Sequence, residues 1–257
     1  MRIAVGVEYD GSHFRGWQAQ TDTRTVQGVV EAALSKVADH PVRVICAGRT
    51  DTGVHATGQV IHFDSQASRS MRSWVLGTNA NLPPDVSLLW ATEVAPGFHA
   101  RFRATARSYR YVILQRFTRP ALLRQRVCWH HRRLELAPMR VAAMHLLGEH
   151  DFTSFRALAC QAKHPVRTVE RLEVGGSGDF IHIDVTANGF LHHMVRNIAG
   201  VLMAIGEGER APDWTRDLLH ARDRTVGGVT APPGGLYLVG VRYPEEFDLP
   251  AVSAAVP

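Results

Sequence analysis

The stretch RIAVGVEYDG, residues 2–11, gives the first indication of the fold. Its apolar side chains alternate along residues 2–9, as on a strand with a buried face, and Asp10-Gly11 is typical of a turn. After Thr25 the apolar residues recur at the spacing of a helix that packs one face on a core, and Thr25 can cap that helix. The chain therefore opens with a strand and then a helix.

The same patterns continue through the first half of the chain. They predict strands over residues 42–46, 59–63 and 86–94 and a helix over residues 71–80. Pro83-Pro84 marks the break before the last of these strands. The first half therefore has the order strand, helix, strand, strand, helix, strand.

The second half repeats this order with weaker signals. Strands are predicted over residues 108–115, 168–174, 180–187 and 235–242, and a helix over residues 139–147. A longer helix follows from the apolar positions between Leu191 and Ile205, with Gly206 as its stop, and residues 175–178 predict a hairpin turn.

This repetition predicts an α+β fold of two ferredoxin-like (βαββαβ) halves, with mostly antiparallel sheets flanked by helices. Many RNA-binding sheets share that topology. The expected boundaries are residues 1–105 for an N-terminal half that carries the catalytic loop and 106–243 for a C-terminal half that completes the active-site cleft. Residues 244–257, rich in proline and small side chains, are expected to form a disordered tail.

Length and composition indicate a globular enzyme-sized protein. The chain has 257 residues, of which 45% are hydrophobic, so it can bury a substantial core. No apolar run is long enough for a membrane span, and the N-terminus does not resemble an export signal. The three cysteines form no CxxC pair, and no ligand array completes a zinc site. We expect a cytoplasmic protein without a metal site or a membrane association.

The positive charge is carried almost entirely by arginine. Only Lys36 and Lys163 are lysines among 29 basic residues, and the formal net charge is +5. Arginine binds phosphates and stacks on bases, which suits RNA, although a coding bias for arginine explains the ratio equally well. Clustering discriminates better, because arginines mixed with aromatic residues favour nucleic acid. The clustered residues are Arg101, Arg103, Arg107, Arg110, Arg124, Arg126, Arg132 and Arg133, with Tyr109, Tyr111 and Trp129 among them.

A polar loop, residues 47–56, lies between the second and third predicted strands. It places one acid, Asp51, close to one permanent cation, Arg49, between Gly48 and Gly53. Loops on a rigid sheet are common sites for catalytic groups, and the glycines allow close approach to a ligand. An ordinary Asp-Thr-Gly turn explains the same letters, so the composition of the loop leaves both interpretations open.

The loop becomes specific by resemblance. GRTDTGVHA, residues 48–56, resembles without interruption the signature of the tRNA pseudouridine synthases that act on the anticodon stem-loop. Other segments are similar to the same family, and together they run from residue 9 to about residue 243. They are YDGSHFRGWQ at residues 9–18, FHARF at 98–102, RSYRY at 107–111, NGFL at 188–191, HMVRN at 193–197 and PPGGLYL at 232–238.

The resemblance implies roles for individual residues. Asp51 would be the nucleophile that attacks either C1′ of the ribose or C6 of uracil, and Arg196 would pair with it and keep it ionised. Tyr109 would stack on the flipped uracil and could assist proton transfer at C5. Arg49 would contact RNA and Leu236 would pack against the base. Apart from the resemblance, residues 11–25 and 101–110 are candidates for phosphate contacts, and we assign further substrate contacts there to Arg15, Gln18, Arg101 and Arg107. Tyr109 and Leu236 could instead be ordinary core residues.

The resemblance also implies the reaction and the partners. The family isomerises uridine to pseudouridine at positions 38, 39 and 40 of tRNA, flips the target base and needs no cofactor. The expected partners are the anticodon arm of tRNA and a second copy of the chain, in a homodimer with a positive groove. Two rival functions are a non-catalytic RNA-binding protein or chaperone, which has no need of Asp51, and an aspartate-dependent hydrolase or nuclease, which usually requires a second carboxylate or a metal cluster.

Overall fold

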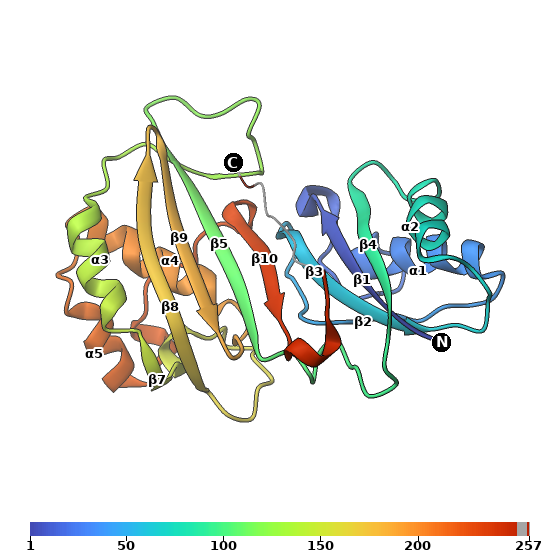
Figure 1. Cartoon of the computed structure of the whole chain (residues 1–257). Helices are drawn as coiled ribbons and strands as arrows, with labels where there is room; N and C mark the ends of the chain where they lie inside the picture. The colour runs from blue at the N-terminus through green and yellow to red at the C-terminus, as the bar shows by residue number, and fades with distance from the viewer. Residues whose placement is uncertain (251–255, 257) are drawn as a thin grey trace. The chain divides into compact units, whose positions relative to one another are not determined.

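The computed structural model describes residues 1–250 and 256, which form two compact units (Figure 1). Unit 1 consists of Met1–Arg107 together with the described part of Tyr237–Val256, and unit 2 consists of Ser108–Leu236. Both units combine a mostly antiparallel sheet with helices. This confirms the α+β fold predicted from the sequence. Among the described residues, no helix is long and apolar enough to cross a membrane.

Unit 1 follows the strand and helix order predicted for the first half. Its sheet runs β4-β1-β3, with β2 on the remaining edge of β3, and these three pairings are antiparallel. The order βαββαβ with this arrangement is that of a ferredoxin-like unit. The elements are β1 (Arg2–Tyr9), α1 (Val26–Ala38), β2 (Ile45–Cys46), β3 (His55–Asp64), α2 (Met71–Asn79) and β4 (Val86–Val94).

A fifth strand of unit 1 comes from the end of the chain. β10 (Leu236–Arg242) pairs in parallel with the start of β3, where Tyr237 is opposite His55 and Leu238 is opposite Ala56. The predicted boundaries had placed residues 235–242 with the second half. The compact units differ from them in that residues 237–250 belong to unit 1. The order of elements along the chain is the same in both cases, so no sequence pattern could tell whether residues 235–242 belong to the second half or to unit 1.

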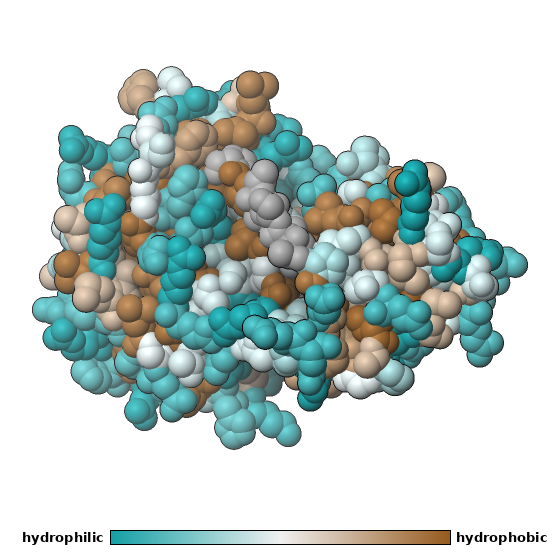
Figure 2. All heavy atoms as spheres, viewed as in Figure 1, coloured by the Kyte–Doolittle hydropathy of each residue, from teal (hydrophilic) through white to brown (hydrophobic). Residues whose placement is uncertain are grey.

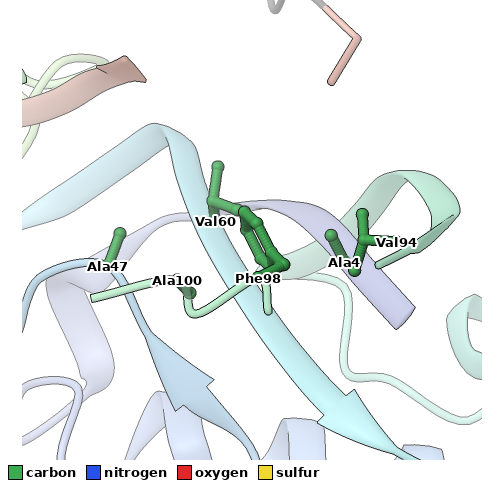
Figure 3. Close-up of a cluster of buried hydrophobic side chains, with 6 residues drawn as sticks. All are labelled: Ala4, Ala47, Val60, Val94, Phe98 and Ala100. Carbon is green, nitrogen blue, oxygen red and sulfur yellow. The ribbon is translucent and has the colours of Figure 1, made fainter. Parts of the chain in front are cut away.

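Both faces of the unit 1 sheet are covered. α1 and α2 cover one face, and on that side Trp74 of α2 meets Phe63 of β3 edge-on at 5.2 Å. The other face carries a cluster of buried apolar side chains from the strands and from the loops after β2 and β4 (Figure 3). The cluster consists of Ala4, Ala47, Val60, Val94, Phe98 and Ala100. Because both faces are covered, successive residues of β1 are buried, from Ile3 to Val7.

The end of the chain covers part of that second face. Residues 244–250 are ordered, with a short 3-10 helix at Glu245–Phe247. Phe247 packs edge-on against Phe98 at 5.1 Å, and Glu246 pairs with Arg103 at 2.7 Å. The sequence predicted disorder for residues 244–257, whereas in the structure apolar side chains between Pro244 and Pro250 reach the sheet. The prediction for residues 251–255 and 257 lies outside the described residues.

Within unit 2 the strands run in the order β5-β9-β8-β7 and are mostly antiparallel, and β6 pairs in parallel with β5. α3 packs on α4 and on β8, and most of α4 is buried. The elements are β5 (Ala106–Gln115), β6 (Cys128–His130), α3 (Leu136–Met144), β7 (Gly148–Asp151), β8 (Val166–Ser177), β9 (Phe180–Ala187), α4 (Met194–Gly206) and α5 (Trp214–Ala221).

Two predicted boundaries in unit 2 are shifted. α3 begins at Leu136 rather than at residue 139, because Pro138 is tolerated in the first turn of a helix, where its missing N–H is not needed. Gly175 and Gly176 remain in the ladder opposite His182 and Ile181, so the hairpin turn is confined to residues 178–179. Gly178 has the positive φ of 57° that this turn requires.

Candidate active site

The loop that carries Asp51 connects β2 to β3, at residues 47–54. Asp51 is half-buried, Arg49 and Thr52 are exposed, and Thr50 between them is buried. The Asp51 carbonyl accepts a hydrogen bond from the Val54 N–H at 3.1 Å, which closes a turn with Gly53 at a φ of 77°. Asp51 therefore sits in a tight turn that leads into β3.

The segment after β1, residues 10–17, holds the first part of this loop. The Trp17 N–H donates to the Thr50 carbonyl at 3.0 Å, and the hydroxyls of Tyr9 and Thr50 are 2.8 Å apart. Gly16 has a φ of +85°, and a Cβ there would lie 2.8 Å from the Thr50 carbonyl oxygen. Only glycine allows this close approach without strain. The backbone on the N-terminal side of Asp51 is thus fixed by residues more than thirty positions earlier.

The same segment holds the second part of the loop at His55. His55 is buried, and its Nδ1 lies 3.0 Å from the Gly11 nitrogen and 3.1 Å from a carboxylate oxygen of Asp10. The hydrogen bond with His55, against the opposing effect of burial, holds the pKa of Asp10 well below its usual range, and Ser12 contributes in the same direction. A Cβ on Gly11 would lie only 2.0 Å from the Val54 carbonyl oxygen. We call residues 10–17 the clasp, since they contact the loop on both sides of Asp51.

Arg107 ties the beginning of the loop to the chain after β4. Its guanidinium donates to the carbonyls of Ala47 at 3.0 Å, Arg101 at 2.7 Å and Ala104 at 3.2 Å. Gln59 of β3 adds a bond from its side-chain amide to the Gly48 carbonyl at 2.7 Å. These carbonyl contacts give Arg107 a positioning role within unit 1, and its predicted contact with substrate remains a prediction.

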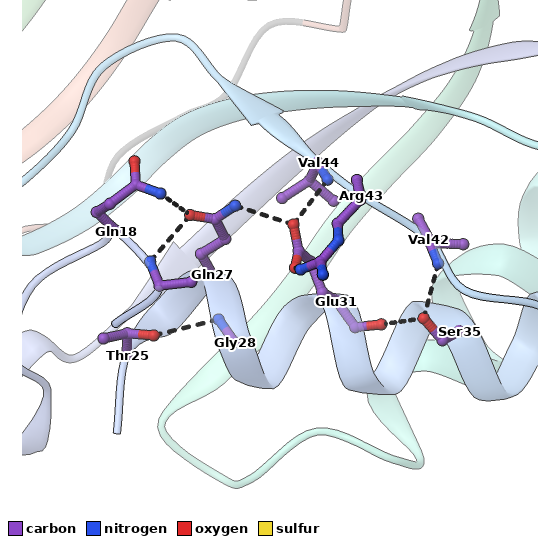
Figure 4. Close-up of polar contacts among 10 residues, drawn as sticks. Gln18, Thr25, Gln27, Gly28, Glu31, Ser35, Val42, Arg43 and Val44 are labelled. Atoms are coloured by element: carbon purple, nitrogen blue, oxygen red, sulfur yellow. Dashed lines mark hydrogen bonds and ion pairs between the residues drawn. The ribbon is translucent and has the colours of Figure 1, made fainter. Parts of the chain in front are cut away.

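A chain of polar contacts leads from the clasp along α1 to the start of β2 (Figure 4). Gln18 donates to Gln27 at 2.7 Å, and Gln27 donates to Glu31 at 2.9 Å. Glu31 is buried and also accepts from the Val44 N–H at 3.0 Å and from Arg43 at 2.8 Å. The Gln18 amide therefore takes part in the scaffold that leads into the Asp51 loop.

In unit 2, Tyr109 and Arg110 lie on β5. Tyr109 is buried and meets Phe190 edge-on, with ring centroids 5.0 Å apart. Arg110 makes a two-pronged ion pair with Asp184 of β9, at 2.7 and 3.0 Å. The RSYRY and NGFL segments are thus brought together, and Asp184 holds Arg110 against β9.

Arg196 lies in the first turn of α4. Its Nε donates to the Ala231 carbonyl at 2.8 Å, and the Ala231 N–H donates back to the Arg196 carbonyl at 3.1 Å. The next residue of α4, the buried Asn197, donates to the Phe155 carbonyl at 2.7 Å and accepts from the Thr230 hydroxyl at 2.6 Å. Arg196 and Asn197 therefore join the start of α4 to the backbone at Phe155 and at Ala231.

Leu236 follows a segment that is closely packed in unit 2. The Tyr111 hydroxyl donates to the Pro232 carbonyl at 2.8 Å, and a Cβ on Gly235 would lie 2.7 Å from the Val112 carbonyl oxygen. Leu236 itself is buried. Residues 232–235 thus lie directly on β5, which also carries Tyr109.

Comparison with known proteins identifies the family. The family model described as tRNA pseudouridine synthase matches residues 5–103 and 142–244. The chain belongs to the tRNA pseudouridine synthase family. Proteins named tRNA pseudouridine synthase A are similar over nearly the whole chain. The one from Nitrosococcus oceani is 60% identical over 256 residues, covering 100% of this chain and 99% of its own length. That from Pseudomonas aeruginosa is 58% identical over 250 residues, covering 97% and 88%.

Membership in the tRNA pseudouridine synthase family confirms the resemblance drawn from the sequence, and it makes the chain an isomerase. The structure places the residues predicted for such a site in both units. Unit 1 holds Asp51, Arg49, Arg15, Gln18, Arg101 and Arg107, and unit 2 holds Tyr109, Arg196 and Leu236. Arg49, Arg15 and Arg101 are exposed, whereas Gln18 and Arg107 are half-buried and engaged in unit 1.

Some residues that shape this candidate site were missed in the sequence. Asp10 was interpreted as a turn former, and its contact with His55 was not foreseen. Gly16 and Trp17 lie in a quoted family segment, but nothing in their letters indicated that they contact the loop of Asp51. Asn197 was quoted beside Arg196 without a role. The available signal was that these residues belong to the matching segments, which marks them without telling what they contact.

Proposed function

We propose that this chain isomerises uridine to pseudouridine at positions 38, 39 and 40 in the anticodon stem-loop of tRNA, with Asp51 as nucleophile and without a cofactor. The observation that supports this most is the uninterrupted GRTDTGVHA match, carried on a loop whose two sides are held by the clasp. A carboxylate that is fixed in position yet half-exposed suits a nucleophile that must meet a flipped nucleotide.

The chemistry needs a group that bonds and then leaves. If Asp51 attacks C1′, the bond from C1′ to N1 breaks and uracil departs as an anion. The base turns, C5 attacks C1′, and the Asp51 carboxylate leaves; C5 then loses its proton while N1 gains one. If Asp51 attacks C6 instead, the adduct forms on the base and is released after the same rearrangement. Both routes are redox-neutral, and both use an ionised carboxylate.

Other residues have defined tasks in this proposal. Tyr109 provides an aromatic surface for the flipped uracil, and Leu236 provides an apolar wall. Arg196 pairs with the Asp51 carboxylate and favours its charged form. Arg49, exposed on the same loop as Asp51, helps to hold the target nucleotide outside its stack. Arg15 and Arg101, which are exposed, contact phosphates.

The test is pseudouridine mapping on unmodified tRNA transcripts, by chemical labelling and primer extension. We expect new signals at positions 38 to 40 with the wild-type chain, without added metal and in the presence of a chelator. Asp51→Ala and Asp51→Asn should give no signal while they bind tRNA with nearly unchanged affinity. Asp39→Asn, at an exposed carboxylate that ends α1, is the matched control and should retain full activity.

Each rival predicts a different result. A non-catalytic RNA-binding protein gives no pseudouridine with any variant, and a nuclease gives shortened transcripts. Activity that survives in Asp51→Ala would refute the nucleophile assignment, and signals outside the anticodon arm would refute the proposed target. The homodimer is a separate part of the proposal. Light scattering should then give a mass of about twice the 28.4 kDa of one chain, and a monomeric mass would contradict it.

A further inference from the structure

A strongly basic stretch of unit 2 lies outside the site described above. Residues 116–133, which we call the basic loop, connect β5 to the segment before α3 and include β6. They contain six arginines and two histidines and no aspartate or glutamate. In a chain with 24 acidic residues, a run of this length without one is a marked concentration of positive charge.

The base of the basic loop is fixed by hydrogen bonds. β6 pairs in parallel with β5, Trp129 donates from its indole N–H to the Arg116 carbonyl at 2.9 Å, and the Arg116 N–H donates to the His130 carbonyl at 3.1 Å. The loop therefore leaves the sheet and returns to it at defined points, and its tip extends above unit 2 in Figure 1. A surface that is held in this way loses little conformational entropy when it binds.

The tip exposes both cations and apolar groups. Phe117 is 89% exposed and Leu122 is 95% exposed. Arg119 and Arg124 are exposed too, and within the described part of the chain their side chains make no hydrogen bond or ion pair. Arg132, in contrast, is paired with Glu207 and Glu209. Figure 2 shows hydrophilic and hydrophobic side chains next to one another over this part of unit 2.

The basic loop also borders a predicted part of the active site. Its returning limb lies against the segment that precedes Leu236, because a Cβ on Gly234 would lie 2.6 Å from the Gln125 carbonyl oxygen, and one on Gly235 would lie 3.0 Å from the Cys128 nitrogen. The two segments are therefore in direct backbone contact within unit 2. A nucleic acid that contacts Leu236 with one base would have neighbouring phosphates within reach of this loop.

We propose that the basic loop is a docking surface for the tRNA backbone outside the reacting nucleotide, with Arg119 and Arg124 on phosphates and Phe117 against an unstacked base or a ribose. This inference rests on the proposed function, because it assumes that tRNA is the substrate. Guanidinium groups without an internal partner bind phosphate without first breaking an ion pair. A second copy of the loop is a poorer partner, since a symmetric contact would place like charges together.

The experiment compares tRNA binding by the full-length wild-type chain, Arg119→Gln/Arg124→Gln and Phe117→Ala. The control is Arg216→Gln on α5, which lies at the opposite end of unit 2 from the loop and is paired with Asp213. Affinity for an unmodified tRNA transcript is measured by fluorescence anisotropy at several salt concentrations. We expect the double variant to bind about tenfold more weakly at low salt, with a salt slope smaller by about one to two, because one counterion contribution is lost per phosphate contact.

Activity and mass separate this inference from the proposed function. With saturating tRNA the double variant should form pseudouridine at the wild-type rate, with a raised KM, while the control matches the wild type in both. If the wild-type chain is active and the double variant has unchanged tRNA affinity and salt slope, the docking surface is overturned and the proposed function stays intact. A change of oligomeric mass with unchanged tRNA affinity would also overturn it, and would assign the loop to contact between copies. Since all three substituted side chains are exposed, a thermal unfolding scan should show no loss of folding.

Discussion

Gly16→Ala is the substitution that tests most directly whether the clasp positions Asp51. Gly16 has a φ of +85°, where an L-residue costs about 1–2 kcal/mol more than glycine. The added Cβ would also lie 2.8 Å from the Thr50 carbonyl oxygen, and this is a backbone atom that cannot turn away. Together the two effects should reduce the free energy of unfolding by about 2–3 kcal/mol.

The larger effect should be on catalysis. The clash can be relieved only if the clasp or the Thr50 backbone moves, and the residue after Thr50 is Asp51. A shift of a few tenths of an ångström to one ångström in a nucleophile can cost about a hundredfold in rate. We therefore expect kcat for pseudouridine formation to fall by ten- to a hundredfold at a temperature where the variant is fully folded, with a smaller change in tRNA affinity.

Urea unfolding and single-turnover pseudouridine formation measure the two effects separately. Gly97→Ala is the matched control, since a Cβ at this exposed turn meets nothing within 4 Å. It should leave both quantities unchanged. If Gly16→Ala loses stability but keeps the wild-type kcat, the clasp supports the fold without positioning Asp51. If it changes neither quantity, the reasoning from its φ and its close approach is wrong.

Two further predictions concern the scaffold around the site. Glu31→Ala leaves the buried Val44 N–H without its acceptor, which should lower the free energy of unfolding in urea by about 1–3 kcal/mol, whereas Glu31→Gln keeps an oxygen there and should cost less. Equal losses in the two variants would show that Glu31 acts mainly through its ion pair with Arg43. That pair is worth less than about 1 kcal/mol, because the Arg43 side chain is 84% exposed. His62 is buried, and burial, with help from His99 and Arg2 and against Asp64, lowers its pKa from 6.5 to about 4, so the neutral ring that accepts the Ala100 N–H is favoured. Because the unfolded chain binds this proton more tightly, the free energy of unfolding should fall as the pH is lowered from about 6.5 to about 4, by at most about 1.4 kcal/mol per pH unit. His62→Asn should flatten this pH dependence. An equally steep curve in the variant would assign the pH dependence to other groups.

Regular elements with clear limits were predictable from the sequence. The strand at residues 86–94 was predicted with its observed bounds, because it alternates and follows Pro83-Pro84, and Thr25 caps α1 by accepting from the Gly28 N–H as expected. β6 and β7 have only three and four residues and depend on a neighbouring strand for their hydrogen bonds, so no local period reveals them. The order of residues 244–250 depends likewise on a distant partner, Phe98.

The family segments predicted which residues belong to the candidate site, but they did not predict which contacts hold those residues. Asp51 and Arg49 could be singled out because the motif is continuous in sequence. The contacts that hold them are not continuous, because Trp17 and Gly16 act on a loop that begins some thirty residues later. Arg107 shows this limit. The cluster of arginines predicted a phosphate contact, and it did not indicate that the Arg107 guanidinium donates to three carbonyls of the chain's own backbone.

The contacts within the motif give a physical reason for its spacing. Gly48 accepts from Gln59 through its carbonyl, and His55 meets the clasp at Gly11. Thr50 bonds to Tyr9 of β1 through its side chain and to Trp17 of the clasp through its carbonyl. Gly53 supplies the positive φ that turns the chain back to β3. Between Gly48 and Gly53 the remaining positions are Arg49, Asp51 and Thr52, of which two are exposed and Asp51 is half-buried. Alternation of anchored and outward positions gives a nucleophile a fixed backbone together with access to a substrate, and neither a flexible loop nor a fully buried carboxylate could provide both.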